Sequence, residues 1–139
     1  MSIADKQEKL VEDFEIFPDW HERYEYVISL GKTLAPMDSN LKTEENIIKG
    51  CQAKVWLDAK FENGRVEYSA DSDSQITKGL IAIFIRVLNG EKPEDILKAN
   101  MEFLTRAGLR DHFISTRANA LNLMTVKMKQ RALEFASHP

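Results

Sequence analysis

The clearest structural signature in this chain is the segment VWLDAKFENGRVEYSA, residues 55–70. Apolar and polar side chains alternate on both sides of Asn63-Gly64, which is the two-residue rhythm of a half-buried strand. Asn-Gly also tolerates the positive φ angles that a two-residue hairpin turn requires. The segment therefore predicts two antiparallel strands joined by a tight turn. A two-stranded hairpin is marginally stable alone, so we expect Asn46–Ile48 to add a short third strand.

Two amphipathic helices are predicted before the hairpin. Apolar residues recur at helical spacing in each, Pro18 closes the first helix, and the second ends before Pro36. Asp19 and Glu22 resemble a capping pair at the start of the second helix. The apolar positions are Leu10, Phe14 and Phe17 in the first helix and Tyr24, Val27, Ile28 and Leu34 in the second.

Three helices are predicted after the hairpin, and together these elements give the fold class. Ile76–Leu88 is apolar nearly all round, as is typical of a central core helix, and Ser72 with Gln75 fits a capping box at its start. A short helix is expected over Pro93–Leu97. The buried stripe of a long final helix consists of Leu121, Met124, Met128, Ala132 and Phe135. The expected fold is α+β: residues 1–139 form a single domain, with a small antiparallel three-stranded sheet and helices packed on one side of it.

The composition excludes several classes of protein. A chain of 139 residues, 43% of them hydrophobic and 29% charged, has the size and balance of one globular domain. The formal net charge of −3 gives no electrostatic reason to expect nucleic acid or an anionic membrane as a partner. No apolar run approaches the roughly 20 residues of a membrane span. The first residues lack the basic start and apolar stretch of a secretory signal, so we expect a cytoplasmic protein.

The single cysteine, Cys51, is the most informative residue. One thiol cannot form an intramolecular disulfide, and an iron–sulfur cluster usually takes about four ligands. Cys51 is either a small buried hydrophobe or, because Gly50 precedes it at a loop-to-strand junction, a thiol that another backbone can approach. If the strand extends back through Ala53, Cys51 faces the core with Val55. Burial would then raise its pKa and protect it at rest.

Other polar residues give weaker signals. His21, His112 and His138 are scattered along the chain, and a zinc site of Cys51, His112 and Asp71 or Asp73 is chemically feasible without evidence that these residues converge. Asp71-Ser72-Asp73 is most simply a helix N-terminus. Trp56 lies on the polar face of its strand, where it either packs beneath another helix or serves as an exposed anchor for a partner.

The segment Gly50-Cys51-Gln52-Ala53-Lys54-Val55-Trp56 resembles the Gly-Cys-Gln-x-x-Val-Trp signature around the active cysteine of the SufE family of sulfur-acceptor proteins. The likeness covers most of the chain from Trp20 to the final helix. It includes Asn46–Lys49, Asp71–Asp73, Lys78–Leu80, Leu109, His112 and Arg117. The chain departs from the family pattern at Ser115, near which the family often has a Ser-Pro or Thr-Pro pair, and at Ala120, where it often has glycine.

The resemblance implies a fold shared with NifU-like and IscU-like scaffolds and the role of a sulfur carrier. A SufS-like, pyridoxal-phosphate-dependent cysteine desulfurase would pass persulfide sulfur to Cys51 by transpersulfidation and be stimulated by its removal. Cys51 would then deliver the sulfur to iron–sulfur cluster assembly on a SufBCD-like scaffold. The carrier itself would need no cofactor, because the pyridoxal phosphate resides on the desulfurase.

The resemblance also assigns roles around Cys51. It places Gly50 and Gln52 in the active-site loop and Arg117 in contact with the desulfurase, and it implies a structural effect of Asp73 on the loop. A lone thiol suits such a carrier, because a neighbouring thiol would discharge the persulfide as a disulfide. Two alternatives stay open, namely a metal or cluster scaffold of the IscU type and a non-catalytic adaptor with an inert Cys51. The sequence also leaves open the identity of the donor and acceptor, whether the chain forms a homodimer, and whether this accessory protein counts as an enzyme.

Overall fold

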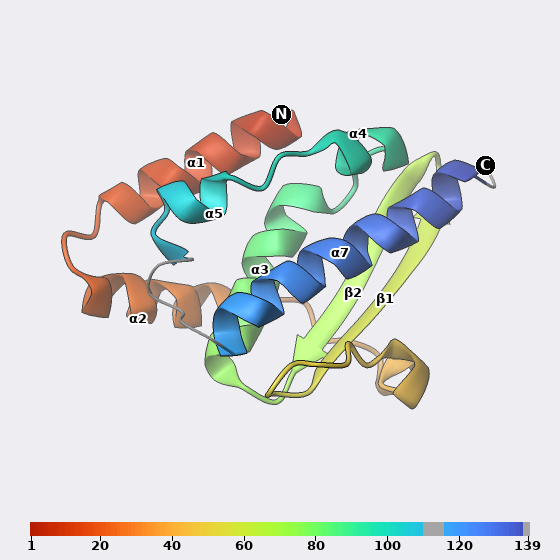
Figure 1. Cartoon of the computed structure of the whole chain (residues 1–139), viewed down its shortest axis with the longest axis horizontal. Helices are drawn as coiled ribbons and strands as arrows, with labels where there is room; N and C mark the ends of the chain where they lie inside the picture. Colours follow the sequence, from red (N-terminus) through yellow and green to blue (C-terminus); the bar gives the residue numbers. More distant parts are fainter. Residues whose placement is uncertain (110–115, 138–139) are drawn as a thin grey trace.

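The computed structural model of the protein describes residues 1–109 and 116–137, with the backbone alone for residues 116–119. The hairpin lies at one end of the molecule and helices α1 and α2 at the other, with α3 between them and α7 running across α3 toward the hairpin (Figure 1). The elements are α1 (Ile3–Glu15), α2 (Trp20–Gly31), the 3-10 turns η1 (Ser39–Leu41) and η2 (Glu44–Asn46), β1 (Val55–Glu62), β2 (Arg65–Ser72), α3 (Gln75–Leu88), α4 (Pro93–Lys98), α5 (Phe103–Arg106) and α7 (Thr116–Ser137).

The predicted hairpin is confirmed. Strands β1 and β2 pair antiparallel in one register from Val55 opposite Ser72 to Glu62 opposite Arg65. Asn63 and Gly64 form the connection with φ angles of 54° and 76°, the positive values that their types allow. The alternating pattern therefore fixes which side chains of the hairpin face the core.

The predicted third strand is wrong for the part of the chain that the structure describes, where the sheet has two strands. The segment before the loop contributes one isolated bridge, between Ile47 and Trp56, and the Ile48 amide donates to the Val55 carbonyl at 2.8 Å. Pairing stops there for a local reason. Asn46 still belongs to the turn η2, and Gly50, with φ of 96°, bends the chain away from β1.

The hydrophobic core lies between the inner face of the hairpin and two helices. Apolar side chains of β1 and β2 meet those of α3 and α7 around one small apolar gap, lined by Ile48, Val55, Leu57, Ala70, Ile81, Ile85, Met124 and Met128. The buried Tyr68 hydroxyl donates to the Met128 carbonyl at 2.7 Å, which ties β2 to α7. Helix α3 is the central core helix, as predicted, because α2 packs against it as well.

Two capping predictions have different outcomes. Asp19 caps α2 as expected, since its carboxylate accepts from the Glu22 amide at 2.9 Å. The capping box at Ser72 is wrong, because β2 continues through Ser72 and the N-cap of α3 is Ser74. The Ser72 hydroxyl instead donates to the Lys54 carbonyl at 2.7 Å. A strand that runs longer than the sequence pattern suggested therefore displaces the helix start.

The final helix covers both the core and the outer edge of β1. Its predicted stripe is buried at Leu121, Met124, Met128 and Ala132, and Phe135 stacks on Phe61 with ring centroids 5.4 Å apart. The guanidinium of Arg131 donates to the Ala59 carbonyl at 2.9 Å. Helix α7 thereby caps an edge that no further strand covers at that position in the described chain. Among the helices described, none has both the length and the apolar character needed to cross a membrane.

Candidate functional site

Cys51 lies in a loop, residues 49–54, between the bridge at Ile47 and the start of β1. The strand does not extend back through Ala53, so the parity argument for the orientation of Cys51 does not hold. The thiol is nevertheless partly buried, because the loop folds back and Cys51 packs against the hydrophobic core. Burial raises the pKa of the Cys51 thiol, as expected for a shielded cysteine.

Hydrogen bonds hold both ends of the Cys51 loop. At the first end, Ile48 is bonded to Val55. At the second end, the Lys54 amide donates to Asp73 Oδ1 at 3.0 Å. The Lys54 carbonyl accepts from the Ser72 hydroxyl at 2.7 Å and from the Asp73 amide at 3.3 Å. Asp73 therefore fixes the base of the loop, although it lies beyond the hairpin in the sequence.

Helix α7 supports the loop from the other side. A Cβ atom added to Gly50 would lie 3.1 Å from Leu123 Cδ1, which is closer than nearly all such contacts. Two features of the structure therefore require glycine at position 50. The backbone has a positive φ there, and a side chain would lie too close to α7. The position of Cys51 depends on this contact as well as on the hydrogen bonds at the loop ends.

A second cluster lies on the outer face of the hairpin. Lys42 Nζ is 2.7 Å from one oxygen of Asp71, and Lys78 Nζ is 3.4 Å from the other. Burial alone would raise the pKa of Asp71, but the bond from Lys42, the Ser72 amide and the charge of Lys78 together hold it below its ordinary value. The Lys42 ammonium also lies 5.5 Å from the Trp56 ring centroid. Trp56 is half-buried with Lys42 over its ring, so it packs within the chain rather than standing fully exposed, although Lys42 belongs to the loop after η1 and not to a helix.

The remaining predicted site residues are only partly placed. Gln52 is exposed beside Cys51. Arg117 falls in the first turn of α7, but its side chain is outside the described residues, as are His112, Ser115 and His138. His21 is exposed on α2, with Nε2 4.0 Å from a Glu25 oxygen. Within residues 1–109 and 116–137, no three His, Cys, Asp or Glu side chains are grouped to hold a metal ion. The zinc combination that includes His112 lies outside that range.

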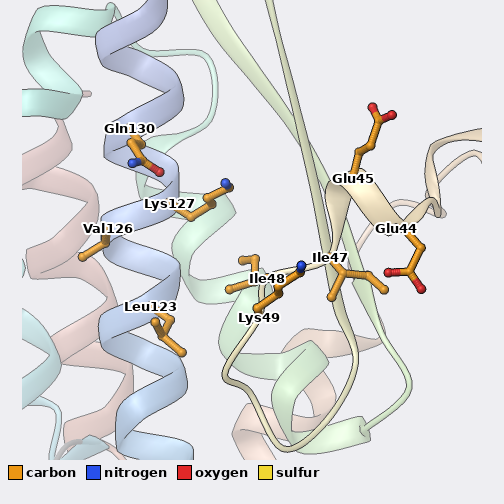
Figure 2. Close-up of a pocket in the computed structure, with 9 residues that line it drawn as sticks. All are labelled: Glu44, Glu45, Ile47, Ile48, Lys49, Leu123, Val126, Lys127 and Gln130. Atoms are coloured by element: carbon orange, nitrogen blue, oxygen red, sulfur yellow. The ribbon is translucent and has the colours of Figure 1, made fainter.

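The structure adds one feature that the sequence analysis missed, a groove beside the Cys51 loop. It has a volume of about 410 Å³ and separates residues 44–49 from α7 (Figure 2). Its lining consists of Glu44, Glu45, Ile47, Ile48, Lys49, Leu123, Val126, Lys127 and Gln130. The two walls are far apart in the sequence, so no local pattern indicates that they meet. The signal for this groove in the sequence is Val126, an apolar residue of α7 that does not belong to the buried stripe of that helix.

A family comparison covers the Cys51 loop and the groove together. The sequence profile described as "SufE: Fe-S metabolism associated domain" matches residues 8–132. The chain belongs to the SufE family. This confirms the resemblance carried by residues 50–56, and Cys51, the loop and the groove all fall within a domain associated with iron–sulfur metabolism.

Several relatives agree with membership of the SufE family. An uncharacterised SufE-like protein of Synechocystis sp. is 36% identical over 91% of this chain and 80% of its own length. A SufE-like protein of Rhizobium meliloti is 32% identical over 90% of this chain and 93% of its own length. SufE-like protein 1 of Arabidopsis thaliana, chloroplastic/mitochondrial, is 37% identical over 96% of this chain but only 36% of its own length.

The solution structure of a hypothetical protein from Thermus thermophilus shares the fold. It superimposes with a TM-score of 0.79 at 19% identity and covers 95% of this chain and 96% of its own. At that identity the likeness supports the mixed helix and antiparallel-sheet architecture alone.

Proposed function

We propose that this SufE-family protein is a sulfur acceptor and carrier that takes persulfide sulfur onto Cys51 from a SufS-like cysteine desulfurase. The observation that carries the proposal is the placement of its one thiol. Cys51 is half-buried on a loop that is held at both ends and rests on α7, in a chain whose family is associated with iron–sulfur metabolism. The carrier would stimulate the desulfurase by clearing its persulfide and deliver the sulfur to a SufBCD-like scaffold in the cytoplasm.

The chemistry is a thiol exchange in which atoms and electrons balance. The Cys51 thiolate attacks the outer sulfur of the donor's cysteine persulfide, the sulfur–sulfur bond breaks, and the donor's cysteine leaves as a thiolate. Cys51 becomes the new persulfide, and the proton that Cys51 lost neutralises the leaving thiolate. No external oxidant or reductant is consumed. The carrier needs no cofactor for this step, because pyridoxal phosphate acts earlier, on the desulfurase.

The raised pKa of the thiol suits a carrier that must wait for its partner. Burial keeps the Cys51 pKa above the ordinary thiol value, so little reactive thiolate is present at neutral pH. A shielded persulfide is also protected from small oxidants and stray thiols. Transfer then requires that the donor expose Cys51. In this scheme Gly50 and Gln52 form the moving loop, Asp73 holds its base, and Arg117 contacts the desulfurase.

The decisive experiment is intact-protein mass spectrometry after incubation with a SufS-like desulfurase and L-cysteine. We expect a mass increase of one sulfur atom on Cys51 that dithiothreitol removes, and no increase in the Cys51→Ser variant. The matched control is the urea unfolding curve of that variant, which should keep the wild-type midpoint. A serine variant that still accepts sulfur and stimulates the desulfurase would refute the proposal. An unmodified wild-type thiol would favour the adaptor alternative, and stoichiometric iron or zinc in the purified protein would favour the scaffold alternative.

A further inference from the structure

The groove between residues 44–49 and α7 has the composition of a docking surface. Its apolar part comes from both walls, with Ile47 on one and Leu123 and Val126 on the other. Val126 has 59% of its surface exposed, which makes it one of the most exposed large apolar residues in the described chain. An open apolar groove with a polar rim is typical of a site that receives another molecule.

The charged groups at the rim have a definite arrangement. Glu44 and Glu45 belong to the turn η2 on one side, whereas Lys127 projects from α7 and Lys49 lies between the walls (Figure 2). In the part of the chain that the structure describes, none of these four side chains takes part in an ion pair. The rim therefore carries two carboxylates and one ammonium group on the 44–49 wall and a second ammonium group on α7, which favours a partner segment with both cationic and anionic groups.

One residue joins the groove to the Cys51 loop. Leu123 lines the groove and also lies against Gly50, the residue before Cys51. Leu123 is only partly buried and faces the open groove, so a bulky side chain that packs against it there would shift it to another rotamer. Displacement of Leu123 removes the support of the loop on the α7 side, while the hydrogen bonds of Lys54 keep its base in place. Leu123 is therefore the residue through which occupation of the groove would reach the Cys51 loop.

We propose that this groove is the docking surface of the sulfur donor, and that Leu123 transmits its occupation to the Cys51 loop. The inference rests on the proposed function. The occupant is a surface segment of the donor enzyme with an apolar side chain that packs against Leu123 and Val126, a cationic group for Glu44 and Glu45, and a carboxylate for Lys49 and Lys127.

The donor fits this role better than the acceptor. The donor meets the carrier while Cys51 is unloaded and half-buried, so it must expose the thiol before any sulfur can move. A partner that binds the groove can use its binding free energy for that purpose. The acceptor meets a carrier that is already loaded. A release mechanism built into the resting structure therefore serves the loading step.

The test uses two exposed apolar residues of the same helix as a matched pair. Val126 lines the groove and Leu133, which is 51% exposed, does not. We expect Val126→Asp to weaken donor binding at least about tenfold, as removal of an interface anchor does, and Leu133→Asp to change it by less than about twofold. Binding is measured by titration calorimetry with the intact desulfurase. Leu133→Asp should also keep the wild-type rate of sulfur transfer, because Leu133 lies outside the groove lining.

A second variant tests the coupling. Leu123→Ala should raise the rate at which iodoacetamide alkylates Cys51 in the free protein severalfold, whereas Val126→Asp should leave that rate unchanged. If Leu123→Ala unfolds the protein, Leu123→Met, which keeps the volume but loses the branched contact, serves instead. An unchanged alkylation rate in a folded Leu123 variant would overturn the coupling.

The outcomes separate this inference from the proposed function. Equal donor affinities of Val126→Asp and Leu133→Asp would overturn the docking surface while sulfur transfer to wild-type Cys51 continued. Loss of self-association alone, measured by sedimentation, would assign the groove to a second copy of the chain. Loss of scaffold binding alone would assign it to the acceptor. Each of these results contradicts the donor assignment, whereas absence of a Cys51 persulfide in the wild type contradicts the proposed function itself.

Discussion

The hairpin and the Cys51 loop are adjacent in the chain, yet they are held in different ways. In the hairpin, paired residues run continuously from Val55 to Ser72 and a turn of matching type joins the strands. The loop before it is hydrogen-bonded at its two ends and lies against Leu123 of a distant helix. The hairpin is determined by its own sequence, whereas the loop depends on contacts from elsewhere. A segment held in this way can open while the rest of the fold stays intact.

The largest expected effect comes from weakening the packing of the hairpin against the hydrophobic core. Leu57→Ala removes a side chain that is only 4% exposed, and we expect a loss of about 3 kcal/mol in the free energy of unfolding. Urea denaturation measures it. At low urea the alkylation rate of Cys51 should stay near the wild-type rate, because the loop contacts are intact. Faster alkylation under those conditions would show that the loop opens only when the whole fold does.

The same substitution at two glycines compares the regions directly. Gly64→Ala places a side chain at φ of 76° with nothing within 4 Å, so only conformational strain of about 1 kcal/mol results. Gly50→Ala also places a side chain at a positive φ, here 96°. In addition, its Cβ would lie 3.1 Å from Leu123 Cδ1. Both variants should be less stable in urea, but only Gly50→Ala should alkylate faster at Cys51. Equal alkylation rates would mean that the loop does not rest on α7.

Removal of the hydrogen bond between the Lys54 amide and Asp73, at the base of the Cys51 loop, has a smaller expected effect. Asp73→Ala removes the acceptor of the Lys54 amide, for which we expect a loss of about 1 kcal/mol and faster alkylation of Cys51. Asp73→Asn keeps an acceptor oxygen and should lie nearer the wild type. The matched control is Asp19→Ala, which removes the cap of α2 with a similar stability loss. If the Asp19 variant exposes Cys51 as much as the Asp73 variant does, the hydrogen bond of Asp73 does not act specifically on the Cys51 loop.

The smallest expected effect is in the pH dependence of the thiol. Burial holds the pKa of Cys51 above its ordinary value, so the folded protein keeps a proton that the unfolded chain releases. This contribution to stability is present below the unfolded pKa and is lost as the pH rises through the folded pKa. We expect the alkylation midpoint in the native protein to exceed that in urea, and to fall toward it in Asp73→Ala. A native midpoint at or below the urea value would contradict this prediction.

Much of the fold could be predicted because its signals are local. Alternation and Asn63-Gly64 determine the hairpin, and helical spacing determines the stripe from Leu121 to Ala132. The errors occur where two elements compete for the same residues. The sequence predicts Asn46 in a strand, but it closes the turn η2, and it predicts Ser72 as a helix cap, but Ser72 remains in β2. Propensity does not decide such cases, because either structure satisfies the backbone groups.

The site was predictable at its centre and not at its edges. The motif around Cys51 identified the loop, since the family signature is local in sequence. The contact of Gly50 with Leu123 and the groove lined by Glu44 and Val126 join segments that are distant along the chain. Such contacts depend on how α7 crosses the hairpin, which no single segment encodes. The depth of burial of Cys51 could not be predicted for the same reason.

The guanidinium of Arg131 donates a hydrogen bond to the Ala59 carbonyl, on the side of β1 that faces away from β2. A strand from a neighbouring molecule would otherwise be able to pair with the backbone at this edge. Without that side chain, the exposed backbone would offer a template for polymerisation into fibres or amorphous precipitate. Truncation of the C-terminal helix before Arg131 would then impair solubility. Helix α7 thus contacts the Cys51 loop through Leu123 and shields this part of the β1 edge from pairing between molecules.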